Sequence, residues 1–274
     1  MVPVLVGSAL AARDDRVRLV PALAALWGAV FIQIGTNLVN DWGDYLRGAD
    51  RDGRLGPPRV LEVGWLTPAE VRAGIVASFL LAAAAGVYLA WVAGPPVIAI
   101  GVASIAAETA YTAGPKPLAY SGIADLFVFL FFGWVAVGGT YFVQAGSLPP
   151  VVLAAAVPVG ALATAILVVN NLRDIEGDRR SGKRTLAVRL GRRGGRIEYV
   201  ALLSAAYVTP VALVLGGHAG IAALLPLATG PLAVREMRRV LTREDGPSLN
   251  RALVGTARLH ALFGALFAAG VAIG

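Results

Sequence analysis

The sequence predicts an all-α, multi-pass membrane protein with one domain over residues 1–274 and about nine transmembrane helices around a central cavity. The first observation is composition, since 57% of the residues are hydrophobic, 15% are charged and the mean hydropathy is +0.70. The second is a series of apolar stretches of helical length. The third is the position of the basic residues, which gather in every second connection between later stretches.

The apolar stretches predict helices at 2–12, 18–45, 69–93, 95–112, 120–144, 150–173, 196–216, 218–236 and 252–273. The first stretch supplies 12 residues, fewer than the roughly 20 that span a bilayer. Its Ser-Ala-Leu-Ala-Ala segment resembles a signal-peptide cleavage site, but the basic region that precedes such a segment is missing. We therefore expect a shortened first helix, or a true start upstream of Met1.

Basic residues are concentrated around 47–72, 116, 173–196 and 235–251, whereas the connections near 94, 146 and 217 hold none. This is the positive-inside pattern, so we expect a protein of the cell (inner or cytoplasmic) membrane whose basic connections face the cytoplasm, with the N-terminus inside and the C-terminus outside. The net charge of +7 then indicates the lipid bilayer and an anionic substrate, not nucleic acid, as partners. No obligate protein partner is evident from the sequence.

Other side chains restrict the chemistry. The absence of cysteine excludes disulfides, thiolate catalysis and iron–sulfur clusters. His218 and His260 are far apart and lack a metal-ligand spacing. Glu108, Asp125 and Arg258 fall inside apolar stretches, where an ionisable group indicates either a functional site or a structural ion pair.

Two acidic clusters lie at the ends of the predicted helices 18–45 and 150–173. They read Asn37-Leu-Val-Asn40-Asp41-Trp-Gly-Asp44 and Asn170-Asn171-Leu-Arg173-Asp174-Ile-Glu-Gly-Asp178. Positions three and four apart share a helix face. One side of the first helix therefore carries Asn37, Asp41 and Asp44, and one side of the second carries Asn170, Asp174 and Asp178. Their oxygens suit Mg²⁺, whose usual site combines one or two carboxylates with a substrate phosphate.

A diphosphate could therefore lie between the two clusters, with the basic residues Arg59, Arg173, Lys183 and Arg184 neutralising its remaining oxygens. Each cluster precedes a basic, glycine-containing connection, a weak repeat that indicates two related helical halves. The alternative is that these are solvated boundary residues in weak surface ion pairs. Likewise, Tyr111, Lys116 and Tyr120 could contact an aromatic acceptor or its acid group, or could be interfacial belt residues.

These motifs resemble those of the UbiA-type superfamily of intramembrane prenyltransferases. The first cluster fits the start of its first motif, but the next aspartate, Asp50, comes two residues later than in the general pattern. That spacing resembles one branch, the 1,4-dihydroxy-2-naphthoate polyprenyltransferases of menaquinone synthesis. Three further segments also resemble that branch: Gly56-Pro57-Pro58-Arg59, the segment 111–120, and the second cluster through Thr185. The resemblance as a whole covers about residues 3 to 270.

The resemblance implies nine transmembrane helices, Mg²⁺ as cofactor, a polyprenyl diphosphate donor and an aromatic acceptor. The implied catalytic and metal-binding carboxylates are Asp41, Asp44, Asp174 and Asp178, with Asp50 as a further candidate ligand. The implied substrate contacts are Asn37, Asn40, Arg59, Tyr111, Lys116, Tyr120, Asn170, Asn171, Arg173 and Lys183. In the implied reaction, metal-assisted loss of diphosphate gives an allylic cation, which the naphthalenediol attacks at the carbon bearing its carboxylate. Carbon dioxide and a proton then leave, giving a demethylmenaquinol.

Three other interpretations are open. The same fold could prenylate 4-hydroxybenzoate, a glycerol phosphate lipid, homogentisate or haem, although those branches keep the shorter first-motif spacing. CDP-alcohol phosphotransferases use one compact motif with Ala-Arg between the aspartates, and this chain has two separated clusters. A cation transporter should hold its carboxylates near the midplane on broken helices, not at helix ends beside basic connections.

Overall fold

Helices form every regular element in the part of the chain that the structure describes. The computed structural model describes residues 1–47, 59–112 and 122–274. In chain order the elements are α1 (Val2–Arg13), α2 (Leu19–Arg47), α3 (Pro68–Ala93), α4 (Pro95–Thr112), α5 (Ala124–Phe129), the π-helix η2 (Leu130–Val135), α6 (Ala136–Ala145), α7 (Pro150–Arg180), α8 (Leu186–Leu215), the 3₁₀-helix η3 (Ile221–Thr229), α9 (Gly230–Thr242) and α10 (Gly246–Ile273). The all-α prediction is therefore confirmed for these ranges.

Two helices differ most from their predicted bounds. α7 continues to Arg180, past the predicted end at residue 173, so the whole second acidic cluster lies on the helix. α8 begins at Leu186, well before the predicted start at 196, where the Thr185 hydroxyl accepts a hydrogen bond from the Val188 N–H. Gly191, at φ +70°, interrupts its helical backbone. Hydropathy missed both segments because they are helical but polar.

The predicted count of nine spans is not confirmed. Within the described ranges, six helices are long and apolar enough to cross a membrane, and the apolar helices Val2–Arg13 and Pro95–Ser104 are shorter. The predicted span 218–236 consists of η3 followed by α9, and neither has the length of a span. Proline inside η3 and in the first turn of α9 removes backbone donors, which opposes one continuous helix. A multi-pass helical membrane protein is nevertheless confirmed.

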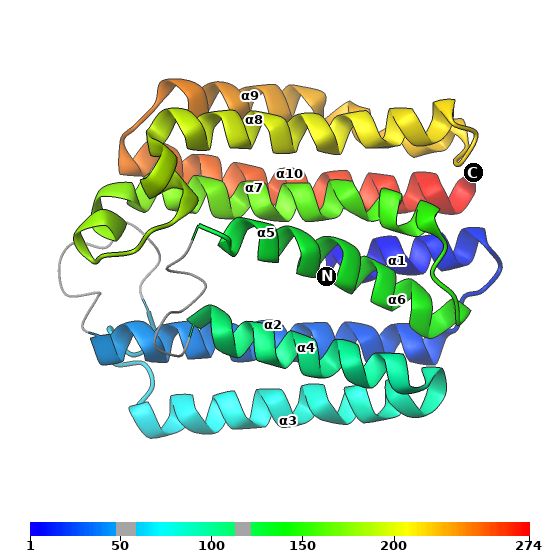
Figure 1. The fold of residues 1–274 in the computed structure, drawn as a ribbon, viewed down its shortest axis with the longest axis horizontal. Coiled ribbons are helices and arrows are strands. Elements are labelled where there is room, and N and C mark those ends of the chain that lie inside the picture. Colours follow the sequence, from blue (N-terminus) through cyan, green and yellow to red (C-terminus); the bar gives the residue numbers. More distant parts are fainter. Residues whose placement is uncertain (48–58, 113–121) are drawn as a thin grey trace.

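The helices lie side by side, with α2, α3 and α4 in one group and α7 to α10 in another, and with α1, α5 and α6 between them (Figure 1). The C-terminal ends of α2, α4, α7 and α9 lie at one end of the molecule. The four basic connections begin from these helix ends, as the charge pattern predicted. The connection 14–18, which carries Arg16 and Arg18, lies at the opposite end.

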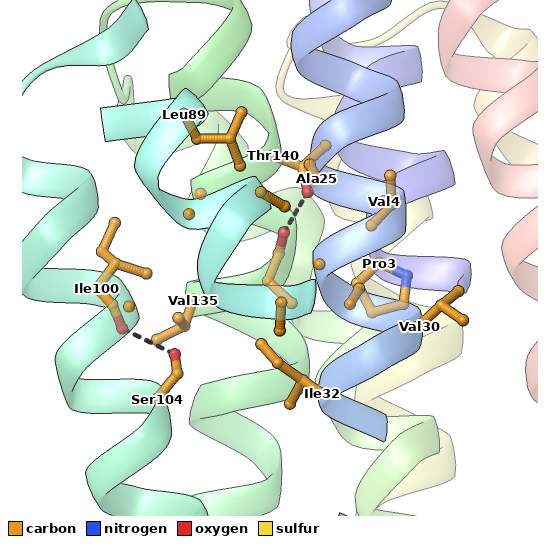
Figure 2. A pocket seen from close by; sticks show the side chains of 18 of the residues that line it. Pro3, Val4, Ala25, Val30, Ile32, Leu89, Ile100, Ser104, Val135 and Thr140 are labelled. Carbon is orange, nitrogen blue, oxygen red and sulfur yellow. Dashed lines mark hydrogen bonds between the residues drawn. The ribbon is translucent and has the colours of Figure 1, made fainter. Parts of the chain in front are cut away.

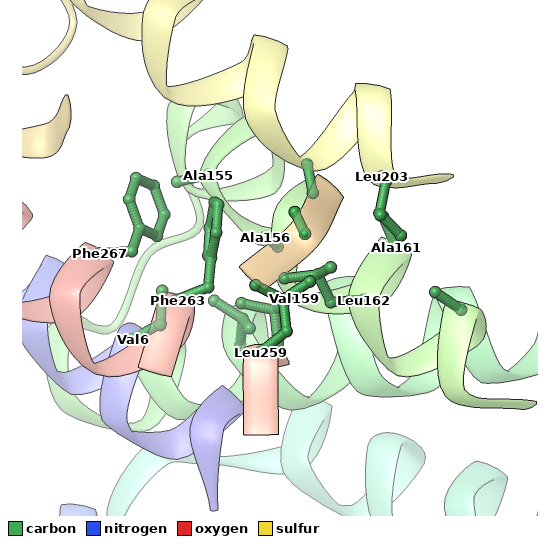
Figure 3. Packing of buried hydrophobic residues seen from close by; sticks show 14 of the residues in the cluster. Val6, Ala155, Ala156, Val159, Ala161, Leu162, Leu203, Leu259, Phe263 and Phe267 are labelled. Carbon is green, nitrogen blue, oxygen red and sulfur yellow. The ribbon is translucent and has the colours of Figure 1, made fainter. Parts of the chain in front are cut away.

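The hydrophobic core is centred on α7. Its most apolar window is 67% buried, and side chains from α1, α8 and α10 surround it, including Val6, Leu203, Phe263 and Phe267 (Figure 3). Gly160 allows α7 to approach its neighbour, because a Cβ at this position would lie 2.6 Å from the Phe129 carbonyl oxygen. This close packing provides a fixed platform for the second acidic cluster.

Candidate functional site

The first acidic cluster lies at the C-terminal end of α2, at the same end of the molecule as the second (Figure 1). Arg59 Nη1 lies 3.1 Å from Asp41 Oδ1, and the Val60 N–H donates to Asp41 Oδ2 at 3.0 Å. The side chains of Asp41 and Arg59 are only 16% and 14% exposed. Both oxygens of Asp41 therefore hold the chain beyond residue 58 against the end of α2.

The two asparagines of this cluster lie on α2 as well. The Asn37 side-chain amide donates to the Gln33 carbonyl at 2.9 Å, and Asn37 is exposed. Asn40 is partly buried beside Asp41. Gln33, Asn37 and Asp41 are spaced by four residues, so they form one row along α2.

The second cluster is organised by one guanidinium group. Arg173 makes a two-pronged ion pair with Asp174, with Nε–Oδ1 at 2.8 Å and Nη2–Oδ2 at 2.6 Å. It also donates to Asn170 Oδ1 at 2.9 Å and, from Nη1, to Asn250 Oδ1 on α10 at 3.1 Å. The Arg173 side chain is 6% exposed, whereas that of Asp174 is 32% exposed. The arginine is thus fixed inside the bundle while its partner carboxylate remains accessible.

Asp178 and Lys183 form the next pair along α7. Lys183 Nζ lies 3.4 Å from Asp178 Oδ1, and the Lys183 backbone N–H donates to the Asp178 carbonyl at 2.9 Å. Gly182 makes this reversal with φ +76°, a conformation that costs glycine little. The basic connection after α7 therefore folds back onto the acidic end of its own helix.

Asn171 points to a different neighbour from Asn170. It is buried, and its Nδ2 lies 3.5 Å from Asp125 Oδ1 at the start of α5. The Thr164 hydroxyl lies 3.5 Å from the Asp125 carbonyl oxygen, so α5 and α7 meet through polar groups there. The structure therefore separates two asparagines that the sequence grouped together, and substrate contact by Asn171 stays a prediction.

Some predicted site residues cannot be placed. Asp50, Lys116 and Tyr120 lie outside the described residues. Asp44 and Tyr111 lie on the described backbones of α2 and α4, but their side chains are outside what the structure describes. Their predicted roles stay predictions.

An apolar cavity of about 430 Å³ lies beside residues 25–34 of α2, next to the first cluster along the helix (Figure 2). Its wall comes from α1, α2, α3, α4, η2 and α6. The Ser104 and Thr140 hydroxyls in this wall donate to the carbonyls of Ile100 and Ala136 in their own helices, so they offer little unpaired polarity. Gln33 also lines the cavity, and it is one turn from Asn37. A polar, acidic row thus continues directly into an apolar space.

The donor set fits a hard cation. The ligands available in both clusters are carboxylate and amide oxygens, which Mg²⁺ prefers to nitrogen or sulfur. Among described side chains no group of three His, Cys, Asp or Glu residues converges, and Asp41, Asp174 and Asp178 each have a basic partner. In the present arrangement each of these carboxylates is neutralised by a basic side chain of the protein itself.

Sequence reasoning missed two contributors to the site. Asn250 reaches Arg173 from α10, and the Val60 N–H reaches Asp41 from the chain after residue 58. Asn250 carried a weak signal, since it is polar and precedes the apolar stretch 252–273. The Val60 contact carried none, because any non-proline residue supplies a backbone N–H.

Known proteins share this sequence and architecture. The family model described as the UbiA prenyltransferase family matches residues 1–270. The 1,4-dihydroxy-2-naphthoate octaprenyltransferase of Escherichia coli is 35% identical over 98% of this chain and 89% of its own length. The protein of the same name from Mycobacterium tuberculosis is 42% identical over 90% of this chain and 83% of its own length.

Solved structures give the same fold. A UbiA homologue from Aeropyrum pernix has a TM-score of 0.68 at 19% identity, covering 95% of this chain and 96% of its own. A UbiA homologue from Archaeoglobus fulgidus bound to GPP and Mg²⁺ has a TM-score of 0.59 at 15% identity, covering 97% of this chain and 95% of its own. The chain therefore belongs to the UbiA prenyltransferase family.

Proposed function

We propose that the protein transfers a polyprenyl group from polyprenyl diphosphate to 1,4-dihydroxy-2-naphthoate, releasing diphosphate and carbon dioxide and giving the demethylmenaquinol of menaquinone biosynthesis. The observation that carries this proposal is the row of Gln33, Asn37 and Asp41, which joins an oxygen-rich, basic site to an apolar cavity. A prenyl diphosphate has the same two-part chemistry. The names of the Escherichia coli and Mycobacterium tuberculosis relatives support this acceptor.

Asp41, Asp44, Asp174 and Asp178 are the proposed Mg²⁺ ligands, with Asp50 as a further candidate. When bound, Mg²⁺ neutralises charge that develops on the departing diphosphate. Arg59 and Lys183 now neutralise Asp41 and Asp178. On binding of donor and metal, these two basic side chains turn to diphosphate oxygens, while Arg173 stays in its buried network and holds Asp174 and Asn170 in place.

The apolar cavity holds the first part of the prenyl chain in this proposal. Its wall keeps water from the allylic carbon, because water would otherwise capture the cation. The carbon–oxygen bond to diphosphate breaks, and the acceptor ring forms a bond to the allylic carbon at the ring position that carries the carboxylate. Loss of carbon dioxide from that position restores the aromatic ring. Tyr111, Lys116 and Tyr120 are the proposed acceptor contacts, and Arg59, Asn37, Asn40, Asn170 and Asn171 complete the proposed donor site.

The proposed orientation follows the charge pattern. The helix ends from which the four basic connections begin lie at the end of the molecule that carries both acidic clusters (Figure 1). By the positive-inside rule this end faces the cytoplasm. Both substrates therefore reach the site from the cytoplasmic side of the cell membrane.

Purified protein in detergent with Mg²⁺, a polyprenyl diphosphate and 1,4-dihydroxy-2-naphthoate tests the proposal. We expect prenylated product and carbon dioxide in equal amounts, and neither after chelation of the metal. Parallel reactions contain 4-hydroxybenzoate or homogentisate. Product from one of these acceptors alone would keep the family chemistry and reject the proposed acceptor, whereas absence of Mg²⁺-dependent donor binding would reject the proposed site.

A further inference from the structure

We propose that the basic surface where α9 meets α10 binds the headgroup of an anionic phospholipid of the surrounding bilayer, at a site separate from both acidic clusters. Four arginines carry this inference: Arg235 and Arg239 on α9, and Arg251 and Arg258 on α10. None of them has a part in the proposed transfer reaction. The inference therefore does not depend on the proposed function.

A buried carboxylate lies beneath the centre of this basic surface. Glu236 is 0% exposed, and its carboxylate lies so close to Gly255 of α10 that a Cβ there would overlap it. Arg235 Nε donates to Glu236 Oε1 at 2.8 Å, and Arg239 Nη1 donates to Oε2 at 2.5 Å. Both guanidinium groups are therefore held where α9 meets α10.

Arg251 and Arg258 lie about one turn on either side of Gly255 on α10. The two helices run antiparallel (Figure 1). With a rotation of about 100° per residue, this direction turns Arg235, Arg239, Arg251 and Arg258 to the same flank of the α9–α10 contact. Arg235 is 59% exposed, Arg239 is 26% exposed, and both α10 arginines are exposed, so the flank is open to an external ligand.

The flank has more positive charge than its own carboxylates neutralise. Glu236 is shared by two arginines, and Asp245 at the start of α10 accepts from the Ser248 N–H beside Arg251. Four guanidinium groups and these two carboxylates leave a net charge of +2. Arg251 donates to the Ser248 hydroxyl, and Arg258 has no hydrogen bond or ion pair among the residues that the structure describes.

The position of Arg258 along α10 indicates which kind of anion could bind there. Its Cα lies about 18 Å along α10 from Gly246, at 1.5 Å per residue. The Cα–Cβ bond of a helical residue tilts toward the helix N-terminus, and α10 begins at the end that holds the basic connections (Figure 1). The long side chain can therefore extend from an apolar position toward the level of the lipid headgroups. A phosphodiester at that level, with acyl chains beside α10, satisfies both the charge and the position.

The test is lipid titration of delipidated full-length protein in detergent, followed by native mass spectrometry. Dioleoyl phosphatidylglycerol is compared with dioleoyl phosphatidylcholine. We expect wild-type protein to prefer the anionic lipid, and Arg251→Gln/Arg258→Gln to lose that preference by about tenfold, since each arginine near a membrane surface adds attraction to anionic lipid. Arg251→Lys/Arg258→Lys should keep most of it, because the charge remains.

The matched control is Arg16→Gln/Arg18→Gln, the same loss of two charges at exposed arginines at the opposite end of the molecule. It should bind both lipids like wild type. Equal affinity of wild type for the two lipids, or an unchanged preference in Arg251→Gln/Arg258→Gln, would overturn the proposal. So would displacement of the lipid by inorganic phosphate at equal concentration, which would indicate a site for a free anion. A change of oligomeric state in the double variant without loss of lipid preference would instead identify this face as a contact between copies.

Discussion

The two acidic clusters lie on helices from two halves of the bundle that differ in how tightly they pack. α2 belongs with α3 and α4, and α7 belongs with α8 and α10, which form the packed half (Figure 1). The most apolar windows of α2 and α3 are each 11% buried, whereas those of α7 and α10 are 67% and 50% buried. The main hydrophobic cluster joins α1 and α6 to α7, α8 and α10 (Figure 3). Among the described side chains, the buried members of the smaller cluster beside α2 to α4 are Leu89, Val97 and Val143. The second acidic cluster therefore lies on a tightly packed helix, whereas the first lies on a helix that lines a cavity.

The arginine beside each cluster reflects this difference. Arg173 binds side chains from its own helix and from α10, and the bundle covers it. Arg59 lies outside any helix, and with the Val60 N–H it ties the returning chain to Asp41. Fixed geometry in one half and an exchangeable contact in the other would allow a donor to enter a site that is already half formed.

The largest expected effect tests whether both halves take part in the chemistry. Asp41→Ala and Asp174→Ala should each lower kcat/KM by about 10³-fold, because each removes a proposed metal-binding carboxylate and a partner of a basic side chain. Steady-state assays with both substrates check this. Glu176→Ala is the matched control, since Glu176 is 61% exposed and pairs with Arg179 on the outer surface. Near-normal activity of Asp174→Ala would show that the packed half supports the site without taking part in the chemistry.

The two arginines provide a sharper comparison. Arg173→Lys should lower kcat/KM by about 30-fold, because an ammonium group cannot reproduce a planar fork bonded to three side chains at once. Arg59→Lys should cost about 5-fold, since its ion pair to Asp41 uses one nitrogen and a charge can be kept. The same kinetic assay measures both. Equal losses would contradict the view that only the packed half needs fixed geometry.

The cavity can be blocked without disturbing the packed half. Gly101 lines the cavity, and a Cβ there would meet nothing within 4 Å. Gly101→Phe should therefore fold, and it should lower kcat/KM for a long polyprenyl diphosphate by about tenfold more than for a five-carbon donor. Competition between the two donors measures the ratio. An unchanged ratio would show that the chain runs elsewhere.

A substitution in the packed half should instead lower the stability of the protein. In Gly160→Ala, the new Cβ would lie 2.6 Å from the Phe129 carbonyl oxygen and 3.1 Å from Gly133 Cα, both of them backbone atoms that cannot rotate away. We expect a loss of about 2 kcal/mol in the free energy of unfolding, seen as a lower Tm in detergent. Gly101→Ala is the control, and it should leave the Tm unchanged or raise it slightly. A similar loss in both variants would mean that the two halves are equally tight.

Hydropathy and motif spacing by themselves determined much of this protein. They predicted the helical membrane class, the grouping of the basic connections and the position of the two clusters at helix ends. The motifs also led to the correct family. These properties depend on each segment alone. A helix satisfies its own backbone hydrogen-bonding groups, and the free energy of moving an apolar segment from water into the bilayer depends on the side chains of that segment.

Only the tertiary structure decided which apolar faces are covered by protein. It placed Asn250 against Arg173, turned Asn171 to Asp125, and left α2 and α3 thinly packed around a cavity. It also divided most of the predicted span 218–236 between η3 and α9. The physical reason is that bilayer and protein interior are both apolar, so a leucine that faces lipid and one that fills a core give the same signal in the sequence.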